Sequence, residues 1–546
     1  MASILSDSDG DDAGGLFPLF SDSDGDDAGG LSPRDLERPT KRRRASPTGE
    51  RVVEQQPEDI FVSGGGCVDD ILSDAGDDVS DILGDVDNCE DDIDHEVEFG
   101  GLPPVTITSG TAMGLRELRP FQWALGVLRC LEYFLGAEVL RGSLLLGGFS
   151  FATHFSGVGT AERSLQCLMA ASPSRFAVSA SLLWSCEKRL GSWRKLLCLP
   201  GDSCVFSDIL DISPEGASLY NRLKDTGEQL NFDQEWKKLC AGGLSPAGPM
   251  CQAHGGKCFQ QCGRPDVDIS GSPCQAWASL GKREGDRSHL TILFLVWAQW
   301  VRAACPLVLI HENVRGFRID LFETVLGDLY EIVSLAVEPS HVAFPCVRRP
   351  RLYFVLFRKG EVKVVAALPP LYHQVSGALE SLVPALQLSD IAIASREQLV
   401  AAENAARRLR HLPALQEPSG DWEYLLSDGQ KRRLRQYIEA LPSAEKGADH
   451  VFDLVMDPVK FGGRRSMSAL PTLQTNSNRM WMQRLRRWFL PVELAYAHGF
   501  PVVPHAARDA GVEDFDSYSV RDVGDGMHMA NVGAVLAIAL SCVQRK

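Results

Sequence analysis

The chain of 546 residues lacks the features of exported and membrane-spanning proteins. Residues 1–20 have no basic start and no apolar run, so no secretory signal is expected there. The longest apolar run, near Leu290–Ile310, is interrupted by Gln299 and Arg302, which favours a buried helix and strand over a membrane span. Its 15 cysteines, an odd number, are spread along the chain, which predicts an intracellular protein with reduced thiols and no membrane partner.

Basic residues are scarce at the start of the chain. Residues 1–100 hold 28 acidic and 7 basic side chains out of totals of 72 and 55, so the rest of the chain is slightly basic. The letters SDSDGDDAGGL occupy residues 6–16 and recur unchanged at 21–31. Such a sequence cannot bury enough apolar surface to offset chain entropy. We therefore expect residues 1–110 to be a disordered acidic tail that either binds protein partners or acts as a solvated spacer.

One compact basic cluster, Lys41–Arg44, follows Pro39 within this acidic tail. A short run of this kind resembles a nuclear localisation signal, although such runs also arise by chance. The cluster predicts a nuclear protein.

Predicted strands and helices alternate from Leu115 onward. Helices are expected near 122–135 and 288–303, and strands near 150–155, 204–206, 266–271, 306–311 and 351–357, with a further strand ending at Glu187. This alternation is typical of an α/β fold with a mostly parallel sheet covered by helices on both faces. The pattern loosens after Lys359, so residues 360–480 are expected to form a smaller, irregular region with a charged helix near 397–412.

A glycine-containing turn, Phe155–Gly159, follows the first predicted strand and precedes a helix. Glycines at such a turn let the backbone approach a ligand, and the helix N-terminus offers free N–H donors. The next strand ends in Glu187, whose carboxylate can accept hydrogen bonds from a ribose. Asp208 follows the third strand and can reach an adenine amino group. Together these residues suit an adenosine-containing cofactor, whereas each alone is also found at plain turns and strand ends.

A sharper signal is Gly271-Ser272-Pro273-Cys274-Gln275, which follows a predicted buried strand. It puts a cysteine at the carboxyl end of a parallel sheet, where ligands of open α/β sheets bind. Glu312, in His311-Glu312-Asn313-Val314, ends the next strand, and Arg349-Pro350-Arg351 opens a later one. The sequence therefore predicts that Cys274 and Glu312 lie at the same edge of the sheet.

These motifs, in this order, resemble those of the C5-cytosine DNA methyltransferase family. Two later segments, Leu490–Glu493 with His498–Pro501 and Gly524–Met527, resemble the family's closing motifs. The resemblance implies a Rossmann-like class I methyltransferase fold with S-adenosylmethionine as cofactor and DNA as partner. The cofactor-binding residues that it implies are Phe155, Ser156, Gly157, Val158, Gly159, Thr160, Glu187, Asp208, Pro273 and Asp525.

The resemblance also implies roles for four catalytic residues. Cys274 would attack C6 of a cytosine that is flipped out of the duplex, and Glu312 would protonate or hydrogen-bond N3. Arg349 and Arg351 would hold the base carbonyl or a phosphate and help to keep the thiolate charged.

Four positions depart from the family pattern. Thr160 stands where a second glycine is usual, Val347 where a glutamine is usual, and Trp277-Ala278 where Phe-Ser is usual. Asp525 replaces an asparagine that normally helps to bind the cofactor, and a shifted alignment through Asn531-Val532 fits its surroundings less well. None of these changes removes the nucleophile, the glutamate or an arginine.

A cluster of potential metal ligands precedes the strand of Cys274. Cys251, His254, Cys258 and Cys262 lie within 12 residues. Thiols and an imidazole are the ligands of structural zinc, but the spacing matches no common zinc motif. A structural zinc ion and a loop of free thiols are both compatible with this segment.

By this resemblance the chain divides into the tail 1–110, a catalytic domain 111–358, a target-recognition region 359–485 and a returning segment 486–546. Basic clusters of the third part would either contact phosphates or form solvated helix faces. Phe461–Ser466 and Pro471–Gln474 resemble a turn and strand that face the groove. The basic clusters are Arg407–Arg410, Lys431–Arg435 and Arg484–Arg487.

Two other functions remain open at this point. The first is a tRNA cytosine-5 methyltransferase, although the Cys-Phe-Thr element of that branch is not found here. The second is a catalytically silent relative that binds DNA, which the departures at Val347 and Asp525 keep open.

Overall fold

The computed structural model describes a body that begins at Leu118, and some predicted features fall outside its described residues. These features are the acidic tail with Lys41–Arg44, the turn at 461–466, and Gln474. The described ranges are 118–172, 176–199, 201, 203–245, 248–258, 262–278, 283–442, 449–459, 468–473, 479–512 and 518–546.

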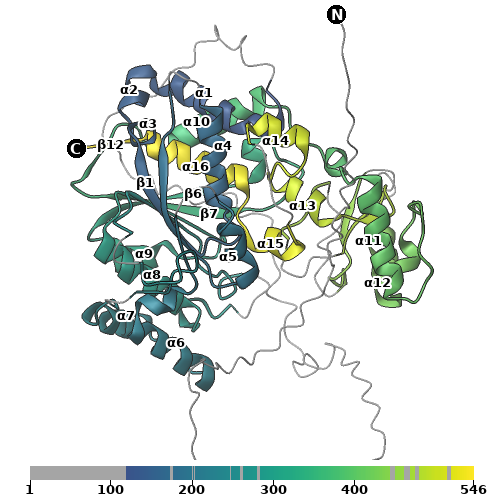
Figure 1. The fold of residues 1–546 in the computed structure, drawn as a ribbon, viewed down its shortest axis with the longest axis horizontal. Helices are drawn as coiled ribbons and strands as arrows, with labels where there is room; N and C mark the ends of the chain where they lie inside the picture. The colour runs from purple at the N-terminus through teal and green to yellow at the C-terminus, as the bar shows by residue number, and fades with distance from the viewer. Residues whose placement is uncertain are drawn as a thin grey trace, which may run out of the picture. The chain divides into compact units, whose positions relative to one another are not determined.

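A seven-stranded sheet forms the centre of this body (Figure 1). Strand β7 is antiparallel to both of its neighbours, β5 and β6, and the other pairings are parallel. The strand order reverses beside β1, and in open α/β sheets a ligand crevice opens at such a point. In spatial order the strands are β3 (Cys204–Phe206), β2 (Ala180–Cys186), β1 (Phe149–His154), β4 (Val267–Ser270), β5 (Val308–Asn313), β7 (Arg351–Arg358) and β6 (Tyr330–Val337).

Side chains alternate along the strands and supply two separate cores, one on each face of the sheet. Val308 and Ile310 of β5 belong to one core, and Leu309 between them belongs to the other. Because both faces are covered, β4 is buried along its whole length, including Asp268.

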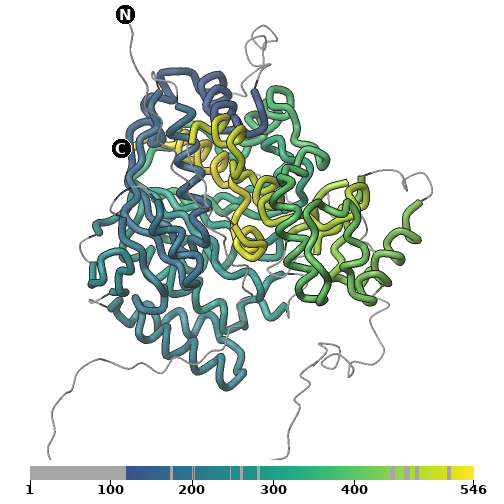
Figure 2. Tube along the Cα trace, turned by 45° about the vertical axis from the view of Figure 1, so that its right-hand side comes forward, coloured from purple at the N-terminus to yellow at the C-terminus, as the bar shows by residue number. Residues whose placement is uncertain are grey.

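The first core is covered by helices from both ends of the described chain. Helix α16 packs against α1 and α4, and Figure 2 shows this last helix beside the earliest ones. The approach is close because Gly533 of α16 leaves no room for a Cβ, which would lie 2.1 Å from the Trp123 ring. The helices of this layer are α1 (Trp123–Leu135), α2 (Ala137–Gly142), α3 (Leu144–Gly147), α4 (Thr160–Ala171), α10 (Leu368–Leu382), α13 (Pro491–Ala497), α14 (Pro504–Ala510) and α16 (Met529–Ser541).

The second core lies under helices that follow β3, β4 and β5. Trp297 and Phe294 of α8 are fully buried there against Phe322 of α9. The helices of this layer are α6 (Pro214–Thr226), α7 (Phe232–Ala241), α8 (Thr291–Ala304) and α9 (Ile319–Leu326). A small further cluster joins Leu196 of α5 (Leu190–Leu196) to Val205 of β3.

A third, smaller core belongs to the recognition region and contains Trp422, Trp481 and Trp488. Its residues run from Ala394 to Val492, whereas α10 packs into the first core. Its elements are α11 (Arg396–Arg408), α12 (Asp428–Ala440) and the antiparallel strands β9 (Val451–Asp453), β10 (Met480–Met482) and β11 (Arg487–Trp488). The chain then returns through α15 (Val520–Asp525) to β12 (Val543–Arg545), which pairs with β8 (Val362–Val364).

The predicted α/β fold is confirmed, since the sheet is mixed, mostly parallel and covered on both faces. The expected strands lie within a few residues of their predicted positions, and β5 extends through Asn313. The sequence pattern did not predict α9 and β6. These two elements lie between β5 and β7 in the chain, and β7 then runs antiparallel to both β6 and β5.

Candidate active site

The glycine turn after β1 wraps around the start of α4. Gly157 and Gly159 have positive φ angles of 57° and 81°, and Phe155 has one of 54°. Gly159 is the N-cap of α4, and Val158 is buried in the first core. Glu187, just after β2, accepts a hydrogen bond of 2.9 Å from the Gly157 amide. The turn is therefore held by its backbone conformation and by a carboxylate from the neighbouring strand.

A cleft lies over the carboxyl ends of β1 and β4 beside this turn. Its empty space is about 360 Å³, part of which is open to solvent. It joins the glycine turn to Glu312 and to the Gly-Asp-Gly-Met segment at the end of α15. The cleft is lined by Thr153, His154, Phe155, Ser156, Gly157, Thr160, Ala161, Ile269, Gly271, Glu312, Asp525, Gly526 and Met527.

The loop that carries Cys274 is held by a buried polar network at the ends of β4 and β5. His311 Nε2 lies 3.0 Å from Ser272 Oγ, and its Nδ1 lies 2.8 Å from Ser270 Oγ. Asn313 donates from Nδ2 to the Ser272 carbonyl over 3.2 Å. Burial lowers the pKa of His311 to about 3, so the ring stays neutral and can both donate and accept. The residue two positions before Cys274 is thus fixed from the neighbouring strand.

Glu312 and Arg351 meet in front of this loop. Arg351 Nε lies 2.9 Å from Glu312 Oε1, and both side chains are nearly buried. Since β7 is antiparallel to β5, the first residue of β7 lies at the same sheet edge as the last residues of β5. Gly271 leaves room for the side chains of Glu312 and Met527, because a Cβ at this position would lie 3.4 Å from Glu312 Oε2 and 2.8 Å from Met527 Cε.

Arg349 is directed toward the end of the chain. Its Nη2 donates to the Gly526 carbonyl over 2.6 Å, and both Nη atoms lie 3.3 Å from the Gly524 carbonyl. Among the residues that the structure describes, no partner accepts from its Nε. Burial and the neighbouring Arg351 lower the pKa of Arg349 to about 10. Arg349 thus holds the backbone on both sides of Asp525, which lines the cleft.

The thiol of Cys274 lies in a field set by these charged groups. Burial raises its pKa, Arg351 and Arg349 act to lower it, and Glu312 acts to raise it. Cys274 itself is partly exposed, on a turn in which its carbonyl accepts from the amides of Trp277 and Ala278 over 2.9 Å. The surroundings therefore favour the neutral thiol until the balance of nearby charge changes.

Several predicted cofactor residues do not line the cleft. They are Val158, Gly159, Glu187, Asp208 and Pro273. Val158 and Gly159 contribute through the backbone of the turn, and Glu187 lies behind Gly157. Asp208 caps the turn after β3 by accepting from the Leu210 amide over 3.0 Å, and it lies 3.2 Å from Lys188 Nζ. The remaining five, from Phe155 to Gly157 with Thr160 and Asp525, do line it.

The sequence reasoning missed a polar cluster that supports the glycine turn. Glu162 of α4 is buried and accepts from Thr153 Oγ1 over 2.5 Å and from Ser185 Oγ over 2.7 Å. Burial raises the pKa of Glu162. An acidic residue in the first turn of the helix that follows the glycine turn was the available signal. Met527 was also missed as a wall of the cleft.

The predicted metal ligands are brought together in a different combination. Cys251, His254 and Cys258 meet Cys204 of β3, which was not predicted as a ligand. Cys262 is not one of these four; its thiol donates to the Cys258 carbonyl over 3.3 Å and also contacts the Cys204 thiol. No local spacing could indicate Cys204, because it lies 47 positions before Cys251.

Comparisons with known proteins match the part of the chain that contains this site. The profile of the C-5 cytosine-specific DNA methylase family matches residues 257–501, which include Cys274, Glu312 and Arg351. A stretch of 152 residues is 26% identical to the type II methyltransferase M.HhaI of Haemophilus parahaemolyticus and covers 25% of this chain. That match spans 44% of the relative, so the chain covers less than half of that protein's length.

Two solved structures were also matched. The Dnmt2 methyltransferase of S. pombe is 13% identical and covers 72% of this chain and 98% of its own, with a TM-score of 0.35. A structure described as a prophage-encoded DNA modification methyltransferase of E. coli is 16% identical and covers 71% and 97%, with a TM-score of 0.38. The fold, the ordered motifs and the family profile define a nucleobase methyltransferase class. Over residues 257–501, somewhat less than half of its length, the chain resembles the C-5 cytosine-specific DNA methylase family.

Proposed function

We propose that this protein is a DNA (cytosine-5)-methyltransferase that uses Cys274 as its nucleophile. The observation that carries the proposal is the meeting of Cys274, Glu312 and Arg351 at one edge of the sheet, beside the cleft. A thiol, a carboxyl group and a guanidinium in this arrangement match the needs of nucleophilic attack on a heteroaromatic ring.

The cleft fits S-adenosylmethionine, the cofactor that the family implies. Gly157 has open space where a Cβ would stand, so a ligand can approach its backbone. Thr160 Oγ1 lines the cleft and is buried with no partner among the described residues, which leaves a polar atom for a ligand. Glu187 and Asp525 provide carboxylates nearby, and burial raises the pKa of each. When bound, the cofactor supplies an electrophilic methyl group.

The residues of the chain then act on the cytosine. Cys274 gives its thiol proton to water, and the thiolate sulfur forms a bond to C6 while N3 takes a proton from the neutral Glu312 carboxyl, which makes C5 electron-rich. C5 then gains the methyl group of the bound cofactor, which is left as a neutral thioether. The C5 proton then leaves to water, the sulfur–C6 bond breaks, the N3 proton returns to Glu312 and the thiolate regains its proton, so that one proton is released for each methyl group transferred. The base has to leave the stack to reach them.

Arg351 and Arg349 have separate tasks in this proposal. Arg351, paired with Glu312, keeps that side chain directed toward the base and offers positive charge to the Cys274 thiolate. Arg349 is a positioning residue, because its donors hold the Gly524 and Gly526 carbonyls.

The recognition region is joined to these arginines. The Arg348 amide donates to the Leu470 carbonyl over 2.8 Å, and Thr472 Oγ1 donates to the Arg348 carbonyl over 2.9 Å. A segment that resembles a groove-facing strand therefore contacts the residue next to Arg349. This connection supports DNA as the substrate, because target reading and chemistry share one stretch of backbone.

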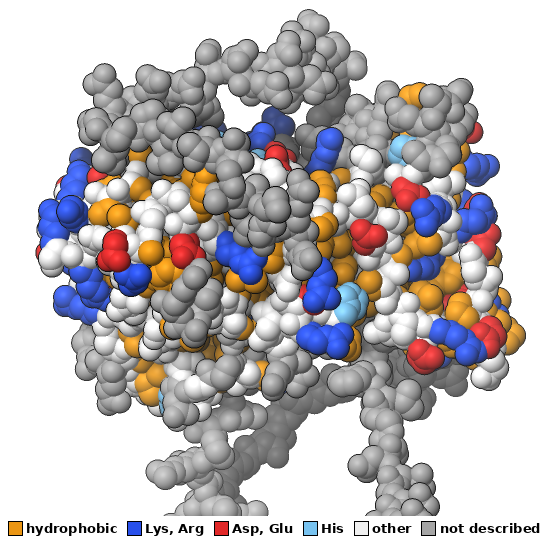
Figure 3. Space-filling view, turned by 90° about the horizontal axis from the view of Figure 1, so that it is seen from above, with side chains coloured by type: hydrophobic (Ala, Val, Ile, Leu, Met, Phe, Trp, Pro, Cys, Tyr) orange, Lys and Arg blue, Asp and Glu red, His pale blue; other side chains and the backbone are white. Residues whose placement is uncertain are grey.

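The basic clusters are less uniform than their sequence suggests. Arg487 is buried in a bidentate ion pair with Glu493, so its guanidinium is unable to contact phosphates. Arg408 and Arg410, by contrast, are exposed. Basic side chains on the face shown in Figure 3 occur in several groups, with no single stripe. Surface charge therefore leaves the choice of nucleic acid to experiment.

The test is transfer of labelled methyl groups from S-adenosylmethionine to duplex DNA and, separately, to tRNA. We expect label on DNA, and we expect Cys274→Ala to remove it without changing the fold. Label on tRNA alone would keep the chemistry and overturn the substrate. No transfer to either by a folded protein that binds DNA would overturn the enzymatic proposal.

A further inference from the structure

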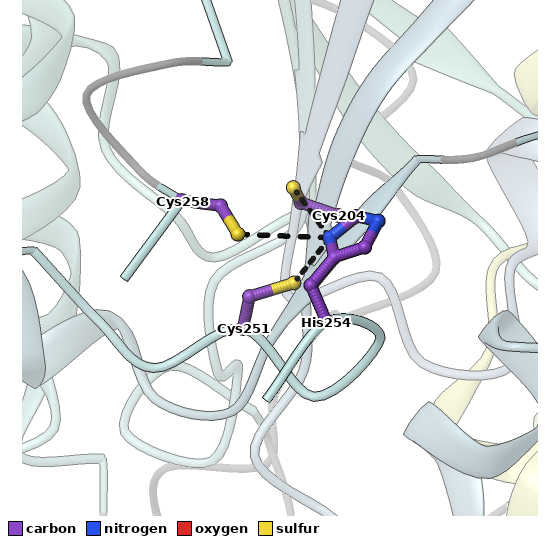
Figure 4. Close-up of side chains that lie close together, drawn as sticks. All are labelled: Cys204, Cys251, His254 and Cys258. Atoms are coloured by element: carbon purple, nitrogen blue, oxygen red, sulfur yellow. Dashed lines mark hydrogen bonds between the residues drawn. The ribbon is translucent and has the colours of Figure 1, made fainter. Parts of the chain in front are cut away.

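Three thiols and an imidazole converge at one point beside β3, on residues that the methyl-transfer chemistry does not use. Cys204 opens β3, and Cys251, His254 and Cys258 come from the loop that leads toward β4 (Figure 4). Cys204 and Cys251 are buried, Cys258 is partly buried and His254 is exposed. Four side chains from two separate segments thus point toward the same small volume.

The distances match the edges of a tetrahedral metal site. His254 Nδ1 lies 3.3 Å from Cys251 Sγ, 3.5 Å from Cys204 Sγ and 3.6 Å from Cys258 Sγ. All four potential ligand atoms lie within 4.8 Å of one another. With Zn–S bonds of about 2.3 Å and a Zn–N bond of about 2.1 Å, each N-to-S edge of a tetrahedron measures about 3.6 Å. The arrangement needs little change to hold an ion at its centre.

The backbone holds this arrangement by contacts of its own. The Cys251 amide donates to the Gly256 carbonyl over 2.8 Å, and the Gly255 amide donates back to the Cys251 carbonyl over 2.9 Å. Gly255 has a φ of 63°, which allows the tight turn between Cys251 and Cys258. The Gln252 amide donates to the Val205 carbonyl over 2.7 Å and so fixes the turn to β3.

We infer that Cys204, Cys251, His254 and Cys258 bind one structural zinc ion. Three thiolates and an imidazole in a closed tetrahedral set are typical of structural zinc, and no position is left for a reacting water. The ion ties the segment before β4 to β3, the edge strand that leads to Asp208. Its binding free energy adds to the stability of the folded body.

Cys240 provides a control outside the cluster, and Cys262 tests which thiols belong to the set. Cys262 lies in the same loop, where its thiol donates to the Cys258 carbonyl and also contacts the Cys204 thiol. Cys240 is exposed at the end of α7. If the proposed set is right, Cys262→Ser and Cys240→Ser keep the metal, and Cys204→Ser and His254→Ala lose it.

The experiment measures zinc by elemental analysis in the purified full chain, without added chelator. We expect one zinc ion per chain in the wild type, Cys240→Ser and Cys262→Ser, and at least a fivefold lower content in Cys204→Ser. Cys274→Ala should keep its zinc, which separates this inference from the proposed methyl transfer. A wild type that lacks zinc and takes none up would overturn the inference, as would loss of zinc in Cys262→Ser but not in Cys258→Ser.

A second measurement avoids variants that fail to fold. Cobalt(II) added to metal-depleted wild type should give the intense visible bands of a four-coordinate ion and the near-ultraviolet band of thiolate ligation. Zinc should then displace the colour. Weak bands typical of six-coordinate cobalt would show that the four side chains do not enclose the ion, and would overturn the inference.

Discussion

Glu312 and Arg351 form a nearly buried ion pair, with 2.9 Å between Arg351 Nε and Glu312 Oε1, at the junction of parallel and antiparallel strands. The pair exists because β7 starts where β5 ends. It also joins the carboxyl group proposed to act on N3 to a guanidinium that acts on the Cys274 thiol. One contact therefore sets both the direction of the acid and the charge near the nucleophile.

Glu312→Gln should test the acid role with little change of shape. Glutamine keeps the size of the side chain but supplies no transferable proton, so the rate of methyl transfer should fall by about 10²- to 10⁴-fold. DNA and cofactor affinities should stay within a few-fold of the wild type. Single-turnover transfer of labelled methyl groups measures the effect, with circular dichroism as the control for folding. A variant within tenfold of the wild-type rate would exclude Glu312 as the proton donor.

Gly271→Ala should damage the cleft through a steric effect that a second change can relieve. The new Cβ would lie 2.8 Å from Met527 Cε, so the Met527 side chain has to move within the cleft. Because Met527 Cε is the free end of a flexible side chain, the shift itself is cheap, and we expect a loss in kcat/KM of about fivefold, equivalent to about 1 kcal/mol. The double variant Gly271→Ala/Met527→Ala should recover most of that loss. An equal loss in both would mean that the backbone of Gly271 matters for another reason.

Local sequence signals located most of the catalytic elements. Cys274, Glu312 and Arg351 each adjoin a run of buried apolar residues, and a strand that ends at a polar residue puts that residue at the sheet edge. The apolar strand pattern and the glycine turn were enough to predict that these three residues lie at the ends of strands. Their meeting, however, depends on the antiparallel course of β7, which follows from the unpredicted β6.

Long-range pairings were the part that one sequence could not supply. Cys204 joins Cys251 only because the loop before β4 folds back to the sheet edge, through a contact between the Gln252 amide and the Val205 carbonyl. Arg487 lies in a basic run typical of an exposed helix face, yet its side chain is buried in an ion pair with Glu493. Charge and sequence spacing limit the roles that a residue can have, and its tertiary contacts determine which of these roles it has in the folded protein.

Glu493→Ala should strongly destabilise the protein. Glu493 is fully buried and accepts from Arg487 Nη1 and Nη2 over 2.7 Å each, and from the Leu490 amide over 2.8 Å. Its removal leaves the Arg487 charge buried and unpaired, which costs about 3–5 kcal/mol. Urea denaturation followed by tryptophan fluorescence measures the change, since Trp488 adjoins Arg487.

Arg486→Ala is the matched control for that change. Arg486 is the neighbour of Arg487, but its pairs with Asp421 and Glu423 are exposed. Exposed pairs contribute about 0–1 kcal/mol, so the denaturation midpoint should move little. Equal effects of Arg486→Ala and Glu493→Ala would contradict the importance of burial for this site.

Glu187→Gln should weaken cofactor binding. Glu187 accepts from the amides of Gly157 and Arg189 over 2.9 and 2.8 Å, so it shapes the glycine turn, and the family resemblance predicts that it also accepts from the cofactor ribose. Loss of a charged acceptor costs about 1.5–3 kcal/mol, which corresponds to a tenfold or greater rise in the Kd for S-adenosylmethionine. Asp211→Asn, an exposed carboxylate after β3, should leave that Kd unchanged. Calorimetric titration compares the two.

Stability should fall as the pH is lowered from 7.5 to 5.5, because burial lowers the pKa of several histidines, among them His311, His498 and His528. Burial lowers the pKa of His311 and of His528 to about 3, and Arg349 acts in the same direction on His528. Above pH 6.5 neither the folded nor the unfolded chain protonates them, so they have no effect there. Below pH 6.5 the unfolded chain binds protons at these histidines and the folded chain does not. The free energy of unfolding therefore decreases with falling pH until the pH approaches the folded pKa.

The size of this effect follows from the two pKa values of each ring. Each histidine should lower the free energy of unfolding by about 1.4 kcal/mol between pH 7.5 and 5.5, given an unfolded pKa near 6.5. Replacing His528 by glutamine removes one titrating ring, so His528→Gln should lose less stability over this interval than the wild type, whatever its stability at pH 7.5. Urea midpoints at both pH values measure the difference. Parallel losses in the two proteins would show that His528 is protonated in the folded state.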